Sequence, residues 1–226
     1  MDPHSVSAPA EFMAALMSLR GSVVRPEISV EEIPAPRGIA PFSVALEGEL
    51  SDLSLLSVAS NVAPDEDFSE SDELPVTGKF IVLHDPHRPA SWQSDFRVVV
   101  LVRAQIDQEI GSDPLLTQVA WSWLNEAFQY CGAEYHNLAG TVTRTVSETL
   151  GDISPAQHRA QLEIRASWSP TFSKTAEGID LDLGPHLSTW SNLLCASIGL
   201  PVVAQGFPTL QGERGPRRIV QGTTSH

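Results

Sequence analysis

The chain has 226 residues, of which 42% are hydrophobic, and this is enough to bury the core of one domain. It carries 28 acidic residues and 14 Lys or Arg residues, so the formal net charge is −14 at pH 7. Binding to nucleic acid or to an anionic membrane needs clustered Lys and Arg side chains. We therefore expect neither nucleic acid nor a membrane as a partner.

Residues 1–9 predict a flexible N-terminal tail. The start of the chain lacks the basic residues and the long apolar run of a secretory signal. The two cysteines, Cys131 and Cys195, fall on the apolar sides of predicted helices, where a free thiol packs like a small hydrophobic group. Together these features predict a reduced, cytoplasmic protein.

A short helix is predicted over residues 10–20, where apolar side chains recur at helical spacing before Gly21. Residues 28–33 then predict a strand that ends at a pair of prolines, and residues 42–46 predict a second strand by their alternation. The two strands are close enough in the chain to form a hairpin.

An acidic segment follows at residues 52–77. Seven of its residues are Asp or Glu and none is basic, which accounts for half of the excess negative charge. Its Ser-rich, Pro-containing composition with few large apolar residues is typical of a mobile insertion. We therefore predict no helix or strand there.

Residues 79–84 and 96–106 predict two further strands, joined by a turn-forming segment that contains two prolines. Residues 98–102 are apolar on both faces of the second strand. A strand that is buried on both faces belongs in the middle of a sheet.

The clearest predicted helix lies between Asp113 and Gly132. Asp113 suits the helix cap, Pro114 suits the first helical position, and Gly132 suits a left-handed exit. The face predicted to be buried contains Leu116, Val119, Ala120, Trp123, Leu124, Ala127 and Cys131.

Two more strands are predicted over residues 140–148 and 160–168, and a last helix from about residue 186 to Gly199. In that helix Leu187, Trp190, Leu194 and Ile198 form one apolar stripe. The second strand of the pair predicts one buried face, made of Ala160, Leu162, Ile164, Ala166 and Trp168.

The order α, β, β, β, β, α, β, β, α predicts an α+β fold with a single antiparallel sheet of about six strands and helices packed on one face. The domain is expected to span residues 10–202, with the mobile acidic insertion at 52–77 and a flexible C-terminal tail at 203–226. This element order resembles the layout of secretion-chaperone-like proteins, with one additional strand. The other face of the sheet is expected to stay exposed to solvent.

The sequence contains no dinucleotide-binding, phosphate-loop, zinc-protease, CxxC or nucleophile-elbow motif. We therefore assign no catalytic residue and expect no cofactor. His84, Asp85 and His87 are the best candidate metal ligands, since two imidazoles and a carboxylate lie within four residues. The favoured interpretation is a simple turn in which Asp85 accepts hydrogen bonds from nearby backbone amides.

Four residues are candidates for binding an anion: Arg97, Arg144, Arg165 and Thr143. Guanidinium groups beside a threonine hydroxyl suit a carboxylate or a phosphate. Arg144 and Thr143 face opposite sides of one strand, so the four cannot line a single pocket. The favoured interpretation is ordinary cross-strand pairing, for example of Arg165 with Glu148 or another acid.

Six segments are distinctive as a set: RPEISVEEIPAPRGIAPFSVAL, FRVVVLVRAQID, DPLLTQVAWSWL, GTVTRTVSETLG, AQLEIRASW and LLCASIGLP. Together they resemble an actinobacterial family known only as a domain of unknown function. The resemblance covers about residues 12–201 and implies no activity, cofactor or catalytic residue.

The sequence leads to two functional hypotheses. The first is a non-catalytic cytoplasmic domain that binds another protein, as an adaptor or in a chaperone-like role. The alternative is a protein that binds, or acts enzymatically on, a small anionic metabolite through the arginines on its strands.

Overall fold

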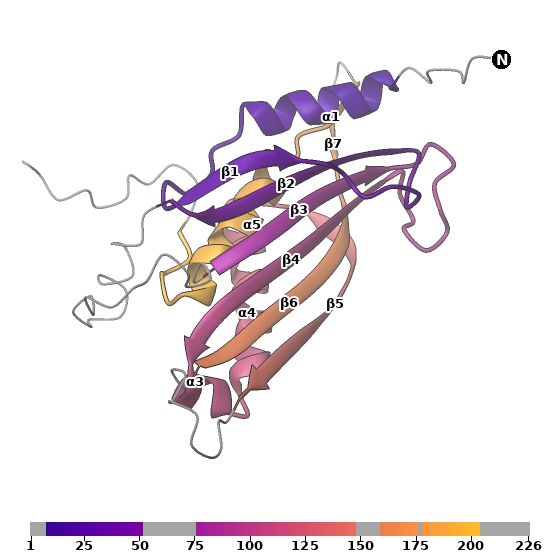
Figure 1. The fold of residues 1–226 in the computed structure, drawn as a ribbon. Coiled ribbons are helices and arrows are strands. Elements are labelled where there is room, and N and C mark those ends of the chain that lie inside the picture. The colour runs from indigo at the N-terminus through magenta and orange to yellow at the C-terminus, as the bar shows by residue number, and fades with distance from the viewer. Residues whose placement is uncertain (1–7, 52–75, 148–158, 176–177, 204–226) are drawn as a thin grey trace, which may run out of the picture.

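The computed structural model describes residues 8–51, 76–147, 159–175 and 178–203. Its core is one six-stranded sheet in which every neighbouring pair of strands is antiparallel. The strands are β1 (Ile28–Ile33), β2 (Phe42–Leu50), β3 (Val76–His84), β4 (Phe96–Asp107), β5 (Tyr135–Val146) and β6 (Arg159–Pro170). Their order across the sheet is β1-β2-β3-β4-β6-β5, so β4 is an inner strand and β1 and β5 are the edges (Figure 1).

The remaining elements of the described residues are four helices and a small hairpin. They are α1 (Ala10–Arg20), α3 (Gln108–Ser112), α4 (Leu116–Cys131), α5 (Gly184–Ser197) and the hairpin of β7 (Ser173–Thr175) with β8 (Gly178–Asp180). The helices pack on one face of the sheet, as Figure 1 shows for α4 and α5 behind the strands. The predicted α+β class, single antiparallel sheet and one-sided helix layer are confirmed, whereas α3 and the β7–β8 hairpin are additions to the predicted order.

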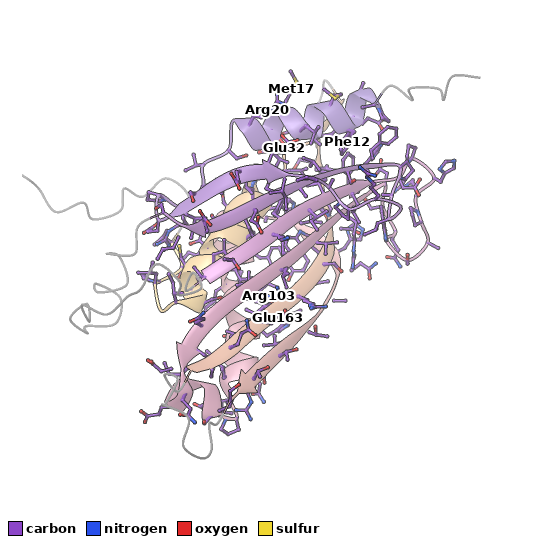
Figure 2. The ribbon with its side chains drawn as sticks, viewed as in Figure 1. Phe12, Met17, Arg20, Glu32, Arg103 and Glu163 are labelled. Atoms are coloured by element: carbon purple, nitrogen blue, oxygen red, sulfur yellow. The ribbon has the colours of Figure 1, made fainter. Side chains whose placement is uncertain are left out.

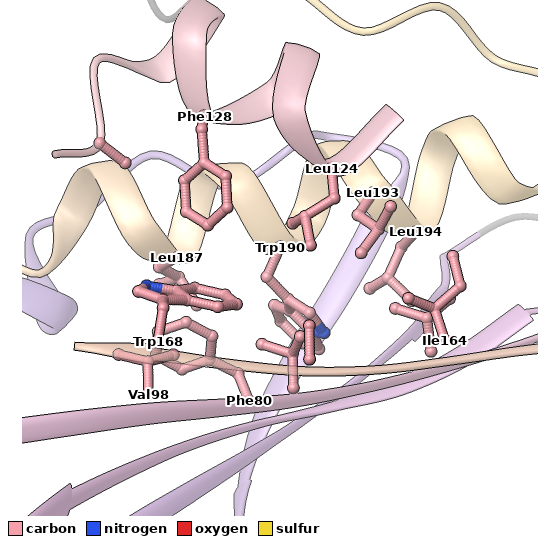
Figure 3. Packing of buried hydrophobic residues seen from close by; sticks show 14 of the residues in the cluster. Phe80, Val98, Leu124, Phe128, Ile164, Trp168, Leu187, Trp190, Leu193 and Leu194 are labelled. Carbon is pink, nitrogen blue, oxygen red and sulfur yellow. The ribbon is translucent and has the colours of Figure 1, made fainter. Parts of the chain in front are cut away.

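Alternation along the inner strands separates the two faces of the sheet. On the side of the helices, Val98, Val100 and Val102 of β4 are at most 1% exposed. The predicted buried face of β6, from Ala160 to Trp168, is also confirmed. These side chains pack against leucines and aromatic rings of α4 and α5 (Figure 3). We call this side the helix face and the other side the open face.

Helix α5 is buried on nearly all sides, rather than along the single apolar stripe predicted from the sequence. The indole of Trp190 is fully buried and lies on the sheet where Gly48 of β2 is paired with Gly78 of β3. A Cβ at Gly48 would lie 2.5 Å from Trp190 Cη2. The two glycines therefore leave the space that the indole fills.

Two strands start earlier than the sequence predicts. β3 begins at Val76, so the last two residues of the predicted insertion belong to the sheet. Residues 52–75 lie outside the described part of the chain. β5 begins at Tyr135 rather than at residue 140, and a bulge between His136 and Ala139 interrupts its first half. Because the bulge breaks the regular alternation of the strand, the sequence pattern does not show where the strand begins.

The regular part of α4 begins at Leu116, two residues after the predicted start. Asp113 still acts at this end, because its Oδ1 accepts a hydrogen bond of 2.8 Å from the Leu115 amide. Gly132 adopts the predicted left-handed conformation, with φ of 66°. The predicted buried face needs two corrections: Val119 is 43% exposed, and Phe128 is buried instead. Trp123 is only half-buried.

Candidate functional site

The open face presents rows of side chains that cross the sheet from strand to strand. In one row Leu101 lies between Lys79 of β3 and Arg165 of β6. In the next row Arg103 is opposite Glu163, and Glu163 is opposite Thr143 of the edge strand. Figure 2 shows Arg103 and Glu163 side by side on this face.

Glu163 is the centre of a three-residue ionic cluster. Its carboxylate accepts hydrogen bonds from Nε of Arg103 at 2.7 Å and from Nε of Arg165 at 2.6 Å. Partial burial acts to raise the pKa of Glu163, but the two guanidinium groups outweigh it and hold the pKa below its ordinary value. Both arginines remain at least half exposed, so each retains free donors toward solvent.

Arg97 lies at the far end of the open face and is only 8% exposed. Its guanidinium donates to the carbonyl and hydroxyl oxygens of Ser167, at 3.1 and 2.7 Å, and to the hydroxyl of Ser169 at 3.3 Å. A fourth bond, of 2.9 Å, goes to the carbonyl oxygen of Asn137. Burial lowers the pKa of this guanidinium. Arg97 therefore ties β4 to β6 and β5 through neutral acceptors.

The bulge in β5 explains how Arg97 reaches a third strand. Asn137 lies within the bulge and has a φ of 57°, in the left-handed region. Its carbonyl oxygen meets Arg97, and its side-chain amide donates to the carbonyl oxygen of Ser91. The bulge thus joins the edge strand to the β3–β4 connection.

Arg144 points to the helix face, on the opposite side of β5 from Thr143. Its Nη1 donates to the carbonyl oxygens of Gly111 at 3.1 Å and Asp113 at 2.7 Å. These bonds fasten the edge strand to the link between α3 and α4.

The structure therefore separates the four candidate anion-binding residues. Arg97 is buried in a network of backbone and hydroxyl oxygens, and Arg144 binds backbone carbonyls on the other face. Arg165 and Thr143 share the open face, where the carboxylate nearest Arg165 is that of Glu163. Arg165 does pair with an acid, but that acid lies two positions away on the same strand and not on a neighbouring strand as predicted. Glu148, the partner suggested from the sequence, lies outside the described residues.

The three candidate metal ligands are not brought together, because His84 points away from Asp85 and His87, which contact each other. His84 lies on the helix face with no exposed surface, and its ring contacts those of Phe12, Phe42 and Phe96. In the turn that follows, Oδ1 of Asp85 accepts hydrogen bonds from the backbone amide and ring Nδ1 of His87. Asp85 thus stabilises a turn, as the favoured interpretation proposed. Within the described residues, no group of three His, Cys, Asp or Glu side chains is placed to hold a metal ion.

Neither ring nitrogen of His84 has a hydrogen-bond partner in the described structure. A buried polar atom without a partner costs about 1–3 kcal/mol. We expect His84→Leu, which removes both nitrogens at similar volume, to raise the free energy of unfolding by about 1 kcal/mol. Urea denaturation of the two proteins measures this difference. A loss of stability instead would show that the imidazole has a favourable partner.

A buried ion pair between Arg25 and Glu27 was not predicted from the sequence. Two hydrogen bonds, of 2.9 and 2.8 Å, join the guanidinium to the carboxylate, and Arg25 also donates to Asn192 of α5 and to the carbonyl oxygen of Pro201. The hydrogen bonds from Arg25 lower the pKa of Glu27. The pair anchors the segment before β1 to α5. The sequence offers no signal for it, because Asn192 is 167 residues away from Arg25.

Both cysteines are free and buried, as predicted for small hydrophobic groups. Burial raises the pKa of Cys195 to about 12, and it also raises the pKa of Cys131. The thiolate is the nucleophilic form of cysteine, so neither thiol is prepared for covalent catalysis.

An open depression of about 420 Å³ lies where α4 ends and β5 begins. Asn125, Phe128, Glu134 and Tyr135 contribute to its lining. None of the candidate anion-binding residues lines it.

Comparison with known proteins places the chain in a family. Residues 8–205 match a family described as a protein of unknown function, DUF3000, and the chain belongs to this family. The predicted membership of a family known only as a domain of unknown function is thus confirmed. No curated protein and no solved structure matches the chain. In the described part of the structure, the helices are too short or too polar to cross a membrane.

Proposed function

We propose that this DUF3000 protein is a non-catalytic protein-binding domain, and that its partner docks on the open face of the sheet. The observation that carries the proposal is the composition of this face. Ile81 of β3 and Val99 and Leu101 of β4 lie half-buried at its centre. A half-exposed apolar centre with a polar surround is the usual anatomy of a protein interface.

Charged side chains border this apolar centre on two sides. On one side, Arg103 and Arg165 both form ion pairs with Glu163. On the other side, Nζ of Lys79 lies 3.5 Å from Oε1 of Glu47. Arginine is enriched at the energetically dominant positions of interfaces, because its planar fork binds carboxylates with two hydrogen bonds. The preferred partner surface is therefore one with exposed carboxylates around an apolar patch.

The reactive groups of the described chain support a binding role over a catalytic one. Both thiols are buried with raised pKa values, and His186 is buried with its Nδ1 accepting a hydrogen bond from Trp168. The metabolite-binding alternative draws less support, because its arginines do not converge on one pocket. It stays a prediction.

Site-specific photo-crosslinking in cells that produce the protein tests the proposal. A photoreactive residue at Leu101 is expected to give a discrete adduct with another protein, and the same residue at Glu126, exposed on α4, is not. Arg103→Glu combined with Arg165→Glu is expected to abolish the adduct, since these changes repel an acidic partner. Equal labelling from both positions, or none from Leu101, would rule out docking on this face.

A further inference from the structure

The two edges of the sheet differ in how they are protected. The edge strand β1 carries Glu31 and Glu32 and is followed by Pro34 and Pro36. Charged residues and prolines of this kind are what natural proteins use to keep an edge strand from pairing with another chain. The β1 edge is thus protected.

The β5 edge lacks these devices over most of its length. From Gly140 to Val146 the sequence is GTVTRTV, with no proline, no acidic residue and one arginine. Thr and Val favour the extended conformation. These residues pair with β6 on one side, and no described strand pairs with the other side (Figure 1). Every second residue of β5 therefore directs its N–H and C=O groups outward.

We propose that β5 pairs antiparallel with β5 of a second copy of this chain, with Thr143 opposite its own counterpart. The regular part of the strand, Gly140–Val146, has Thr143 at its centre. A twofold axis through this point joins the two sheets into one and keeps both open faces on the same side. This inference is independent of the proposed function.

The side chains agree with this register. Thr141 is opposite Thr145 of the second copy on the open face, and paired threonines stabilise neighbouring strands. On the helix face Arg144 is opposite Val142, so the two arginines do not face each other. Val146 is opposite Gly140, which has no side chain. A register centred on Arg144 would instead place like charges together.

Local charge also favours a second copy over a basic partner. The chain as a whole has a net charge of −14, yet Tyr135–Val146 contains no acidic residue. Association through β5 therefore brings together two strands that carry none of the acidic residues responsible for the overall negative charge.

Sedimentation velocity and disulfide trapping test the proposal on the full chain. We expect a concentration-dependent monomer–dimer equilibrium, and Thr143→Cys is expected to form an interchain disulfide on mild oxidation. Residues opposite each other in antiparallel strands have Cα atoms about 4.5–5.5 Å apart, which is within disulfide range. The native thiols are buried and do not compete.

Two matched variants check the register and the edge. Thr145→Cys is expected not to crosslink, because in this register its own counterpart lies four residues, or about 14 Å, along the partner strand. Thr143→Lys is expected to shift the equilibrium to monomer, whereas Ser29→Lys, on the exposed β1 edge, is expected to leave it unchanged.

Circular dichroism confirms that each variant is folded. A wild-type protein that remains monomeric at every concentration, or a Thr145→Cys crosslink that forms faster than the Thr143→Cys crosslink, would overturn the proposal. The photo-crosslinking result from Leu101 bears only on the open face, so the two proposals fail separately.

Discussion

Truncation of Trp190 to alanine is expected to lower the free energy of unfolding by about 4 kcal/mol, in the middle of the range for removing a buried aromatic side chain. Trp190 has no exposed surface, and the centroid of its ring lies 5.7 Å from the centroid of the Phe80 ring. Trp190→Phe is expected to cost less, because a phenyl ring keeps part of the packing and removes an indole N–H that has no partner in the described structure. Urea denaturation measures both changes.

The contact between Trp190 and the glycine pair can be tested from the sheet side. Gly48→Ala would place a methyl group 2.5 Å from Trp190 Cη2 and 3.1 Å from Cζ2, and overpacking of this kind costs about 2 kcal/mol. A phenyl ring at position 190 does not reach these positions. In the Trp190→Phe background Gly48→Ala should therefore cost much less, because only the contact of the new Cβ with Ile28 Cγ2, at 3.2 Å, remains.

The interaction energy of this double-mutant cycle is the decisive quantity. A value near zero, with Gly48→Ala equally harmful in both backgrounds, would show that the glycine is needed for its backbone and not for the indole. Gly38 offers a control, because a Cβ there meets no atom within 4 Å. Its positive φ of 78° means that Gly38→Ala tests backbone strain alone.

The sheet could be predicted from the sequence because the alternation of apolar and polar residues indicates which side of a strand is buried. In β6 every second residue from Ala160 to Trp168 is apolar, and all of them are buried. Gly48 and Gly78 carry no such signal. Gly78 directly follows the predicted acidic insertion and adds no side chain to the alternation, so the predicted strand began after Gly78 rather than at Val76.

Helix α5 could not be predicted in full because its polar residues are buried. Three of them satisfy their hydroxyl groups within the helix itself: Thr189 donates to Pro185, Ser191 to Ser188 and Ser197 to Leu193. A hydroxyl that donates to a carbonyl of the preceding turn needs no solvent. Periodicity of apolar residues does not reveal this, so one stripe was predicted where the whole helix is enclosed.

The candidate site shows the same limit. The arginines on the strands were identified from the sequence, but their partners depend on geometry that no local pattern contains. Arg97 is buried because the bulge at Asn137 brings a carbonyl oxygen to it. Arg165 is exposed because it lies on the open face of β6, beside Glu163. Identical side chains therefore have a structural role in one place and an accessible position in the other.

Acidification from about pH 7 to about pH 4 is expected to remove about 3 kcal/mol of stability through His186. Burial lowers the pKa of this histidine from its ordinary value of 6.5 to about 4, and the residue is 2% exposed. Between these two pKa values the unfolded chain binds a proton at this position and the folded chain does not. Stability therefore falls as pH falls through this window.

His186→Asn isolates this contribution. Its side-chain oxygen can replace Nδ1 as the acceptor for Trp168 Nε1, which lies 3.1 Å from Nδ1, but it cannot be protonated in this range. The free energy of unfolding is measured by urea denaturation at several pH values between 7 and about 4.5. The slope of this free energy against pH should be smaller in the variant, by an amount that corresponds to the binding of up to one proton. Glu27 loses its stabilising charge only below this window, because its pKa is lowered from an ordinary value of 4.5.

Trp168→Phe distinguishes burial from hydrogen bonding as the cause. This variant removes the indole donor but leaves His186 enclosed by α5 and the sheet. If burial lowers the pKa, the wild-type dependence on pH persists in Trp168→Phe although the protein is less stable overall. If the dependence disappears in Trp168→Phe, or survives in His186→Asn, then burial of this imidazole is not what makes the fold sensitive to acid.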